Sequence, residues 1–185
     1  MKIMMVLLLA LPAVSCNFLD FDETSGLKSK EDMYKYYNSV EQMLTNVYSY
    51  MPNNLTTETM RDCGSDDAEH GNTASVYQYF NNGVWSAVNT VDDLWSLYYG
   101  IRAANSFIAE VQNVDLSRYE HNGAYDNWMK KLAFFPYEAR VLRAYYFFEL
   151  ARRYGDIAMP LDVLDASKAN TIAKTPFAKV VDFIV

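Results

Sequence analysis

Cysteine is almost absent from this chain of 185 residues, which contains only Cys16 and Cys63. If Cys16 carries a lipid, as its sequence context suggests, Cys63 has no partner for an intrachain disulfide. A lone cysteine is usually a small buried apolar residue. Histidine is equally scarce, and no His-Glu-x-x-His run, phosphate-binding loop or glycine-rich dinucleotide fingerprint occurs. These absences argue against a metalloprotease or a nucleotide-dependent enzyme, and we expect no cofactor.

Positively charged residues are fewer than negatively charged ones. The chain has 16 Lys and Arg against 23 Asp and Glu, so its formal net charge is −7. Such a surface repels phosphate backbones, which excludes nucleic acid as a principal partner. Aromatic residues, in contrast, reach 15% of the chain. Their flat rings suit either core packing or the binding of a ligand.

Only one long apolar run occurs, at residues 3–11, and it is shorter than the roughly 20 residues that a transmembrane helix requires. It follows Lys2 and precedes small residues, which is typical of a signal peptide, here residues 1–15. We therefore expect an exported protein without a transmembrane anchor in this part of the chain.

Cys16 directly follows Ala13-Val14-Ser15, and this arrangement resembles the bacterial lipobox, in which lipid is attached to the cysteine. Ala13 stands where many lipoboxes have leucine, and the alternative is ordinary cleavage with an incidental thiol at Cys16. We predict lipidation of Cys16, followed by a polar tether over residues 16–28. Each buried methylene of an acyl chain stabilises membrane attachment by about 0.8 kcal/mol.

Apolar residues at helical spacing predict four helical segments. The first begins at Ser29, which resembles a capping box with Asp32, and continues until Pro52. The second begins at a similar pair, Thr90 with Asp93.

The second segment has two unusual residues. Gly100 would cost about 1 kcal/mol relative to Ala inside a helix, so another element should pack closely there. Asn105 falls on the apolar face, so its amide should bond the backbone of a neighbouring loop.

The third segment covers about residues 123–154, and because its apolar phase continues past Pro136 we predict one long helix kinked there and stopped at Gly155. In the fourth, Thr175 and Pro176 should supply the cap and first turn. The chain ends inside this helix, which predicts a fragment, with residues 29–185 forming an incomplete helical region.

The predicted fold class is all-α, with antiparallel pairs of helices similar to tetratricopeptide repeats and a long irregular loop.

Residues 138–150 read EARVLRAYYFFEL and are followed by Arg153-Tyr154-Gly155-Asp156 and Pro160-Leu161. This run closely resembles the signature of the RagB/SusD family of nutrient-binding outer-membrane lipoproteins. Residues 16–20, 95–105 and 175–185 extend the resemblance over the whole mature segment. One departure is Tyr137, where many relatives have glycine.

The resemblance implies an α-superhelix of which only the N-terminal region is present. It also implies a lipoprotein of the outer membrane, exposed at the cell surface, that binds glycans or in some members peptides. Its implied partners are a SusC-like TonB-dependent transporter, to which it delivers the ligand, and membrane lipid held through Cys16.

The charged residues of the signature are predicted to be structural. Residues two apart do not face each other on a helix, so Glu138 and Arg140 need partners on other elements, whereas Glu149 can reach Arg153 on the next turn. The same structural role is expected for the remaining signature residues, Arg143, Tyr154 and Gly155.

Residues 52–89 show no strong helical period, and so long an irregular stretch is usually functional or disordered. Aromatic rings and amides alternate in it, a mixture that suits the apolar faces and hydroxyl rims of sugars. The predicted ligand-binding residues are Tyr77, Tyr79, Asn81, Asn82 and Trp85. The alternative is that these rings pack on the helices.

Asp62, Asp66, Asp67, Glu69 and His70 form an acidic cluster in the same loop. Oxygen ligands of this kind could hold calcium, but the spacing matches no known motif, and a solvated acidic turn is the preferred interpretation.

The favoured function is therefore glycan capture by a binding protein that is not an enzyme. The alternatives are a helical interaction scaffold without ligand and, less favoured, a secreted glycoside hydrolase, which would need two carboxylates flanking a sugar cleft.

Overall fold

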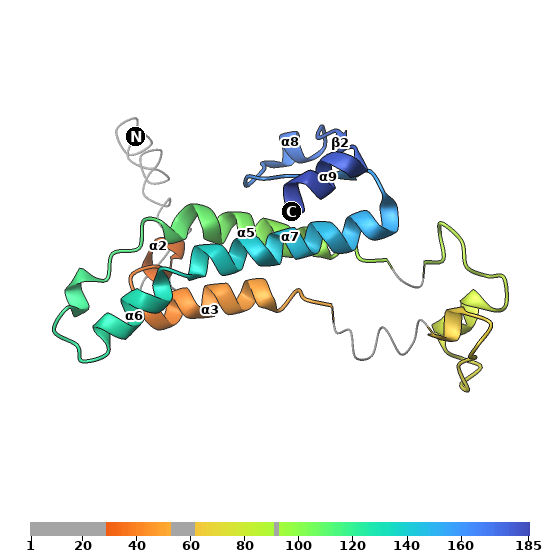
Figure 1. The fold of residues 1–185 in the computed structure, drawn as a ribbon, viewed down its shortest axis with the longest axis horizontal. Coiled ribbons are helices and arrows are strands. Elements are labelled where there is room, and N and C mark those ends of the chain that lie inside the picture. Colours follow the sequence, from red (N-terminus) through yellow and green to blue (C-terminus); the bar gives the residue numbers. More distant parts are fainter. Residues whose placement is uncertain (1–28, 53–61, 91–92) are drawn as a thin grey trace, which may run out of the picture.

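The computed structural model describes residues 29–52, 62–90 and 93–185. These residues are mostly helical, which confirms the predicted all-α class (Figure 1). The predicted signal peptide, Cys16 and the tether of residues 16–28 lie outside the described residues.

The first predicted helix is divided into α2, Lys30–Met33, and α3, Tyr37–Tyr48. The Ser29 side chain caps α2 by accepting the Asp32 N–H at 3.1 Å, as predicted. The prediction of one continuous helix is wrong, because Tyr36 adopts an extended backbone between the two. The break turns two rings inward, since Tyr34 lies 6.4 Å from Phe107 and Tyr37 stacks on Trp128 at 5.0 Å between centroids.

The second predicted helix, α5, covers Leu97–Val111 and begins later than expected. Thr90 does not cap it, since its hydroxyl donates to the Asp93 carboxylate at 2.7 Å in the preceding segment. Trp95 also precedes α5, where its ring stacks on Tyr154 at 3.9 Å between centroids. The aromatic contact and the Thr90–Asp93 pair thus belong to the approach to the helix.

The long third segment consists of two helices, α6, Tyr125–Leu132, and α7, Phe135–Tyr154. The predicted single helix kinked at Pro136 is wrong, because the break lies before this proline, which occupies the first turn of α7. Proline is tolerated there because the first amides of a helix have no intrahelical acceptor. The predicted stop at Gly155 is confirmed, and its φ of +68° is a conformation that side-chain-bearing residues rarely adopt.

After Gly155, strand β1, Ile157–Ala158, pairs antiparallel with β2, Lys174–Thr175. The short helix α8, Ala166–Ala169, lies between them, and α9, Phe177–Ile184, follows β2. Thr175 therefore belongs to a strand and is not the predicted helix cap. The Asp156 carboxylate accepts the Phe177 N–H at 2.9 Å and so supplies the acceptor at the start of α9.

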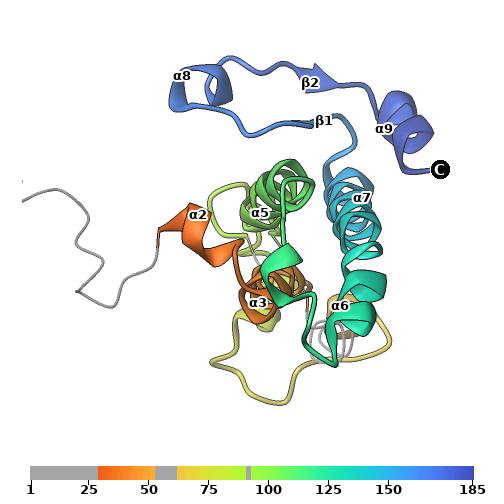
Figure 2. The ribbon, with the colours of Figure 1, turned by 90° about the vertical axis from the view of Figure 1, so that its left-hand side faces the viewer.

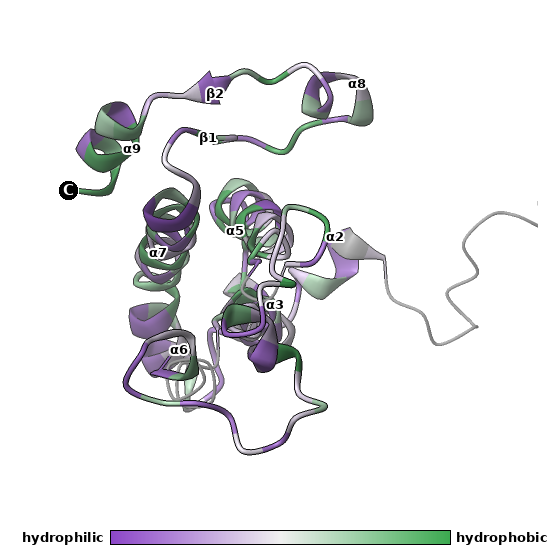
Figure 3. Cartoon of the chain, turned by 90° about the vertical axis from the view of Figure 1, so that its right-hand side faces the viewer, coloured by the Kyte–Doolittle hydropathy of each residue, from purple (hydrophilic) through white to green (hydrophobic). Residues whose placement is uncertain are grey.

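Helices α3, α5 and α7 pack side by side, with α9 against α7 (Figures 1 and 2). Figure 3 shows α5, α7 and α3 nearly end-on, with the segment of residues 155–175 above α5. Gly100 permits the close packing that its sequence context predicted, because a Cβ there would lie 2.8 Å from atoms of both Tyr146 and Tyr50. Fully buried side chains in the core include Val40, Val47, Ile101, Phe107, Tyr146, Phe147, Leu150 and Val180.

Three short 3₁₀ helices complete the described elements: η3, Asp62–Gly64, η4, Val76–Phe80, and η5, Ser117–Tyr119. The first two belong to the predicted long loop.

Candidate functional site

Residues 62–90 form a small unit held together by its own side chains. The Asn81 amide donates to the Cys63 carbonyl at 2.9 Å, and the Gln78 amide donates to the His70 carbonyl. Cys63 is buried, as predicted for a lone cysteine, and the Phe80 ring packs over Gly64. In Figure 1 this unit stands beyond one end of the helices. The segment is thus built by local contacts, and its surface faces outward.

Trp85 is the most available of the predicted ligand-binding aromatics, with 57% of its surface exposed. Its ring and the Phe80 ring form a T-shaped pair at 5.2 Å between centroids, so Phe80 supports it. Tyr77 and Tyr79 are partly buried, and the Tyr77 ring lies 5.9 Å from His70. Among the three predicted rings, Trp85 is therefore best placed to meet a ligand.

The two predicted asparagines differ in how far their amides are already engaged. Asn81 donates to Cys63 and so holds η4 to η3. Asn82 uses its side-chain oxygen to accept the Val84 N–H at 3.0 Å, while its amide nitrogen bonds no residue in the described ranges. Asn82 thus retains a donor near Trp85, and Asn81 is a structural contact.

The acidic cluster of the same unit is not arranged as a metal site. Within residues 29–52, 62–90 and 93–185, no group of three or more His, Cys, Asp or Glu side chains is arranged to hold a metal ion. His70 Nδ1 instead accepts the Asn72 N–H at 3.1 Å.

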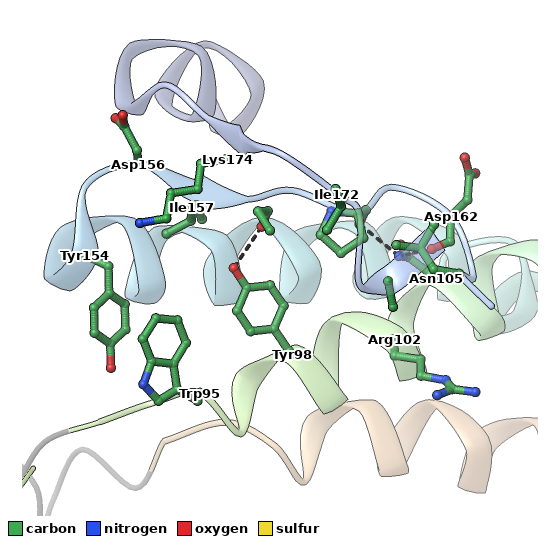
Figure 4. A pocket seen from close by; sticks show the side chains of 14 residues that line it. Trp95, Tyr98, Arg102, Asn105, Tyr154, Asp156, Ile157, Asp162, Ile172 and Lys174 are labelled. Atoms are coloured by element: carbon green, nitrogen blue, oxygen red, sulfur yellow. Dashed lines mark hydrogen bonds between the residues drawn. The ribbon is translucent and has the colours of Figure 1, made fainter. Parts of the chain in front are cut away.

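A larger cleft of about 670 Å³ lies between α5 and the segment of residues 155–175 (Figure 4). Its floor is one side of α5 and the residues before it, and its roof is the two-stranded segment with α8. The side chains that line it include Trp95, Tyr98, Arg102, Asn105, Tyr154, Ile157, Ile172 and Lys174.

Three hydrogen bonds fasten the roof of this cleft to α5. The Tyr98 hydroxyl donates to the Ala158 carbonyl at 2.9 Å, and the Asn105 amide donates to the carbonyls of Pro160 and Asp162, each at 3.0 Å. The predicted bonding of Asn105 to a neighbouring loop is therefore confirmed. Burial raises the pKa of Tyr98, which keeps its hydroxyl protonated as a donor.

Arg143 of α7 completes this connection. Its guanidinium donates to the Asn105 side-chain oxygen at 2.7 Å and to the Leu161 carbonyl at 3.0 Å, and it lies over the Phe183 ring of α9. Burial lowers the pKa of Arg143, with Arg140 nearby acting in the same direction. Arg143 thus links α5, α7, α9 and the roof segment.

Aromatic rings form one end of the cleft. Trp95 lies between Tyr154, on which it stacks at 3.9 Å, and Tyr98, whose parallel ring is 6.3 Å away between centroids. The Tyr154 hydroxyl accepts the Leu94 N–H at 3.3 Å. Trp95 nevertheless keeps 51% of its surface exposed.

Sequence analysis placed residues 95–105 in the second helical segment and predicted a loop contact only for Asn105, so it missed this cleft. Trp95, Tyr98 and Asn105 all line it, but the roof is supplied by residues about 60 positions later. No local pattern in α5 signals that a two-stranded segment will cover it.

The acidic residues of the signature contact the predicted kinds of partner. The Glu138 carboxylate accepts the hydroxyl of Tyr48, on α3, at 2.8 Å, and Glu149 pairs with Arg153 at 2.6 Å. The partner on another element that was predicted for Arg140 is not found among the described residues, because its side chain is exposed on α7.

Residues 17–181 match the model of the SusD-like family that is described as starch-binding and associating with the outer membrane. The chain is also similar to two solved structures from Bacteroides fragilis NCTC 9343. A SusD-like protein aligns with a TM-score of 0.61 and 20% identity over 84% of this chain. A SusD-like carbohydrate binding protein aligns with a TM-score of 0.59 and 22% identity over 82% of this chain.

The chain spans only 29% and 30% of the lengths of those two proteins. At these identities the likeness concerns the fold. No curated protein matches the chain.

Proposed function

The chain belongs to the SusD-like family, and from this membership we propose that it is part of a cell-surface protein that captures oligosaccharide or polysaccharide. The observation that carries the proposal is the family match over residues 17–181, because the family is described by starch binding and by association with the outer membrane. The fold shared with a SusD-like carbohydrate binding protein supports it. The family is described by binding and not by catalysis.

The unit of residues 62–90 is the proposed place of contact with the glycan. Trp85 offers an exposed ring to the C–H face of a sugar, and Asn82 offers an amide donor to a hydroxyl. Tyr77 and Tyr79 would contribute smaller parts of the surface, since both are half-buried.

Removal of the Trp85 ring should weaken glycan binding without unfolding the protein. A stacked ring contributes about 0.5 to 1.5 kcal/mol beyond the area it buries, so Trp85→Ala should lower affinity several-fold. Tyr79→Ala should have a smaller effect in the same direction. The measurement is calorimetry of the purified protein with a panel of oligosaccharides, together with circular dichroism and the melting temperature.

Tyr137→Ala is the matched control, because Tyr137 is an aromatic residue with 61% exposure that lies on α7, outside this unit. A large fall in melting temperature for Trp85→Ala would place its ring in the core. Unchanged affinity and stability would place the glycan site elsewhere. A wild-type protein that binds none of the oligosaccharides would favour the alternative of a helical scaffold.

We also propose that the protein is held in the outer membrane by lipid on Cys16. No helix in the described ranges combines the length and apolar character needed to cross a membrane. Because the acyl chains would be attached to the Cys16 thiol, Cys16→Ala should move the protein from the membrane fraction to the soluble fraction, as measured by fractionation and metabolic labelling with palmitate. Cys63→Ala is the control, because this buried thiol should leave both labelling and partitioning unchanged. Unaltered membrane attachment of Cys16→Ala would contradict lipid anchoring.

Delivery to a SusC-like TonB-dependent transporter is the last part of the proposal. It is supported by the family's association with the outer membrane. Affinity purification of the tagged protein from its native membrane should recover such a transporter, and recovery of the tagged protein by itself would count against this partnership.

A further inference from the structure

The cleft between α5 and residues 155–175 presents hydrogen-bond donors that no described residue uses. Lys174 lines the roof, Arg102 lies on α5, and Trp95 has an indole N–H at the end of the cleft. Within the described ranges, none of these three groups makes a hydrogen bond or an ion pair. A ligand above Trp95 therefore meets the Lys174 side chain, whereas the Arg102 guanidinium points away from the aromatic end (Figure 4).

The nearby carboxylates do not balance the Lys174 cation at the aromatic end of the cleft. Figure 4 shows the carboxylates of Asp156 and Asp162 pointing away from Trp95 and Tyr98, while the Lys174 side chain lies above the aromatic end. One oxygen of Asp156 is already occupied, since it accepts the Phe177 N–H. The aromatic end of the cleft thus presents the cation of Lys174, although the chain as a whole carries a net charge of −7.

The aromatic end defines the shape of a suitable ligand. Half of the Trp95 surface is open to solvent even though the ring stacks on Tyr154, and the Tyr98 ring continues the same wall. A pyranose ring has an apolar C–H face that can pack on such a wall and a rim of oxygen acceptors that can meet the donors. The volume of about 670 Å³ is within the usual range of about 300–1,000 Å³ for sites of small ligands.

We propose that this cleft is a second carbohydrate subsite that takes an acidic sugar ring, with the uronate carboxylate held by Lys174 and the ring packed against Trp95. The cleft has a stable shape before the ligand arrives, because Tyr98, Asn105 and Arg143 already tie its roof to α5 and α7. This inference rests on the proposed glycan-binding function and adds a preference for charge.

The test compares tetragalacturonate with the neutral maltotetraose on the purified full chain by calorimetry. Lys174→Gln should weaken tetragalacturonate binding about three- to ten-fold and leave maltotetraose binding unchanged, because it removes a charge-assisted hydrogen bond at a partly exposed site. Lys179→Gln is the matched control, since this lysine is exposed on α9 and does not line the cleft. Raising the salt concentration should reduce tetragalacturonate binding to the wild type more than to Lys174→Gln.

Trp95→Phe provides a second variant that keeps a ring on Tyr154 and should weaken binding of tetragalacturonate at an unchanged melting temperature. Equal effects of Lys174→Gln and Lys179→Gln would overturn the subsite, as would failure of the wild type to bind tetragalacturonate while it binds maltotetraose. Those outcomes leave the proposed glycan-binding function standing. If neither oligosaccharide nor any other glycan binds the wild type, both the function and the subsite are rejected.

Discussion

Glu149 lies on the buried side of α7, and only 2% of its surface is exposed. It pairs with Arg153 at 2.6 Å and with Arg152 at 3.0 Å, so a single buried anion holds two cations on its own helix. A buried charge is costly unless it is paired, and the loss of one partner leaves the other uncompensated. Glu149 therefore matters to the stability of α7 and not to ligand chemistry.

Replacement of Glu149 by alanine should lower the free energy of unfolding by about 3 to 5 kcal/mol, because both arginines lose their buried anion. Denaturant unfolding monitored by circular dichroism measures this change. Glu120→Ala is the control, since that carboxylate is exposed, and a surface substitution usually changes stability by less than about 0.5 kcal/mol. Similar unfolding midpoints for the two variants would show that the Glu149 pair is energetically neutral.

The predictability of individual contacts depends on how far apart their partners lie in the sequence. The Glu149–Arg153 pair follows from their spacing of one helical turn, and the polar partner of Asn105 follows from the cost of burying an amide. The identity of that partner does not follow, because Pro160, Asp162 and Arg143 reach Asn105 from two other elements. Local chemistry thus predicts that a bond is required, while the tertiary fold selects the atoms that make it.

The helical elements show the same division. Apolar spacing correctly predicts helices around α3, α5, α7 and α9, because the buried faces repeat with the helical period. The helix boundaries differ from the predicted ones where tertiary packing or a proline decides where a helix begins. Tyr36 is extended so that Tyr34 and Tyr37 both reach the core, and Pro136 lies in the first turn of α7 instead of in a kinked middle. The cleft was missed for a related reason, since its roof and floor are remote in sequence.

Gly100 provides a test of how closely α5 packs against α7 and α3. Alanine favours a helix over glycine by about 1 kcal/mol, so propensity predicts that Gly100→Ala is stabilising. Packing predicts the opposite, because the new Cβ would lie 2.8 Å from a ring carbon of Tyr146 and 2.8 Å from the Tyr50 Cβ. Overpacking of a core typically costs about 1 to 3 kcal/mol, so we expect a net loss of stability.

Thermal and denaturant unfolding of Gly100→Ala measure this balance. Gly123→Ala is the matched control, because no heavy atom lies within 4 Å of its added Cβ. It should be nearly neutral. If Gly100→Ala unfolds at a higher temperature than the wild type, then Tyr146 and Tyr50 move aside easily and the helices are packed less tightly than the structure shows.

At the scale of the whole molecule, an apolar stripe runs along the outward side of α7 and its N-cap residue. The stripe consists of Phe134, Tyr137, Val141 and Phe148, which are between 45% and 68% exposed. Their spacing places them on one side of the helix, opposite the side that packs on α5. A continuous apolar surface of this kind usually marks an interaction site or a tendency to associate.

The stripe should cause the purified chain to self-associate as its concentration rises. Association buries apolar surface on both copies, which is favourable at about 25 cal/mol per Å² before the cost of immobilising them is subtracted. Sedimentation velocity over a range of concentrations should therefore show a growing dimer or oligomer fraction. The double variant Val141→Lys with Phe148→Lys should abolish that fraction without loss of helix content, because neither side chain belongs to the buried core.

A charge-matched control places the same two lysines at Val76 and Val163, which are exposed and lie outside α7. If the control suppresses association as strongly, the cause is net charge and not the stripe, and if the wild type stays monomeric at every concentration, the stripe does not bind a second copy.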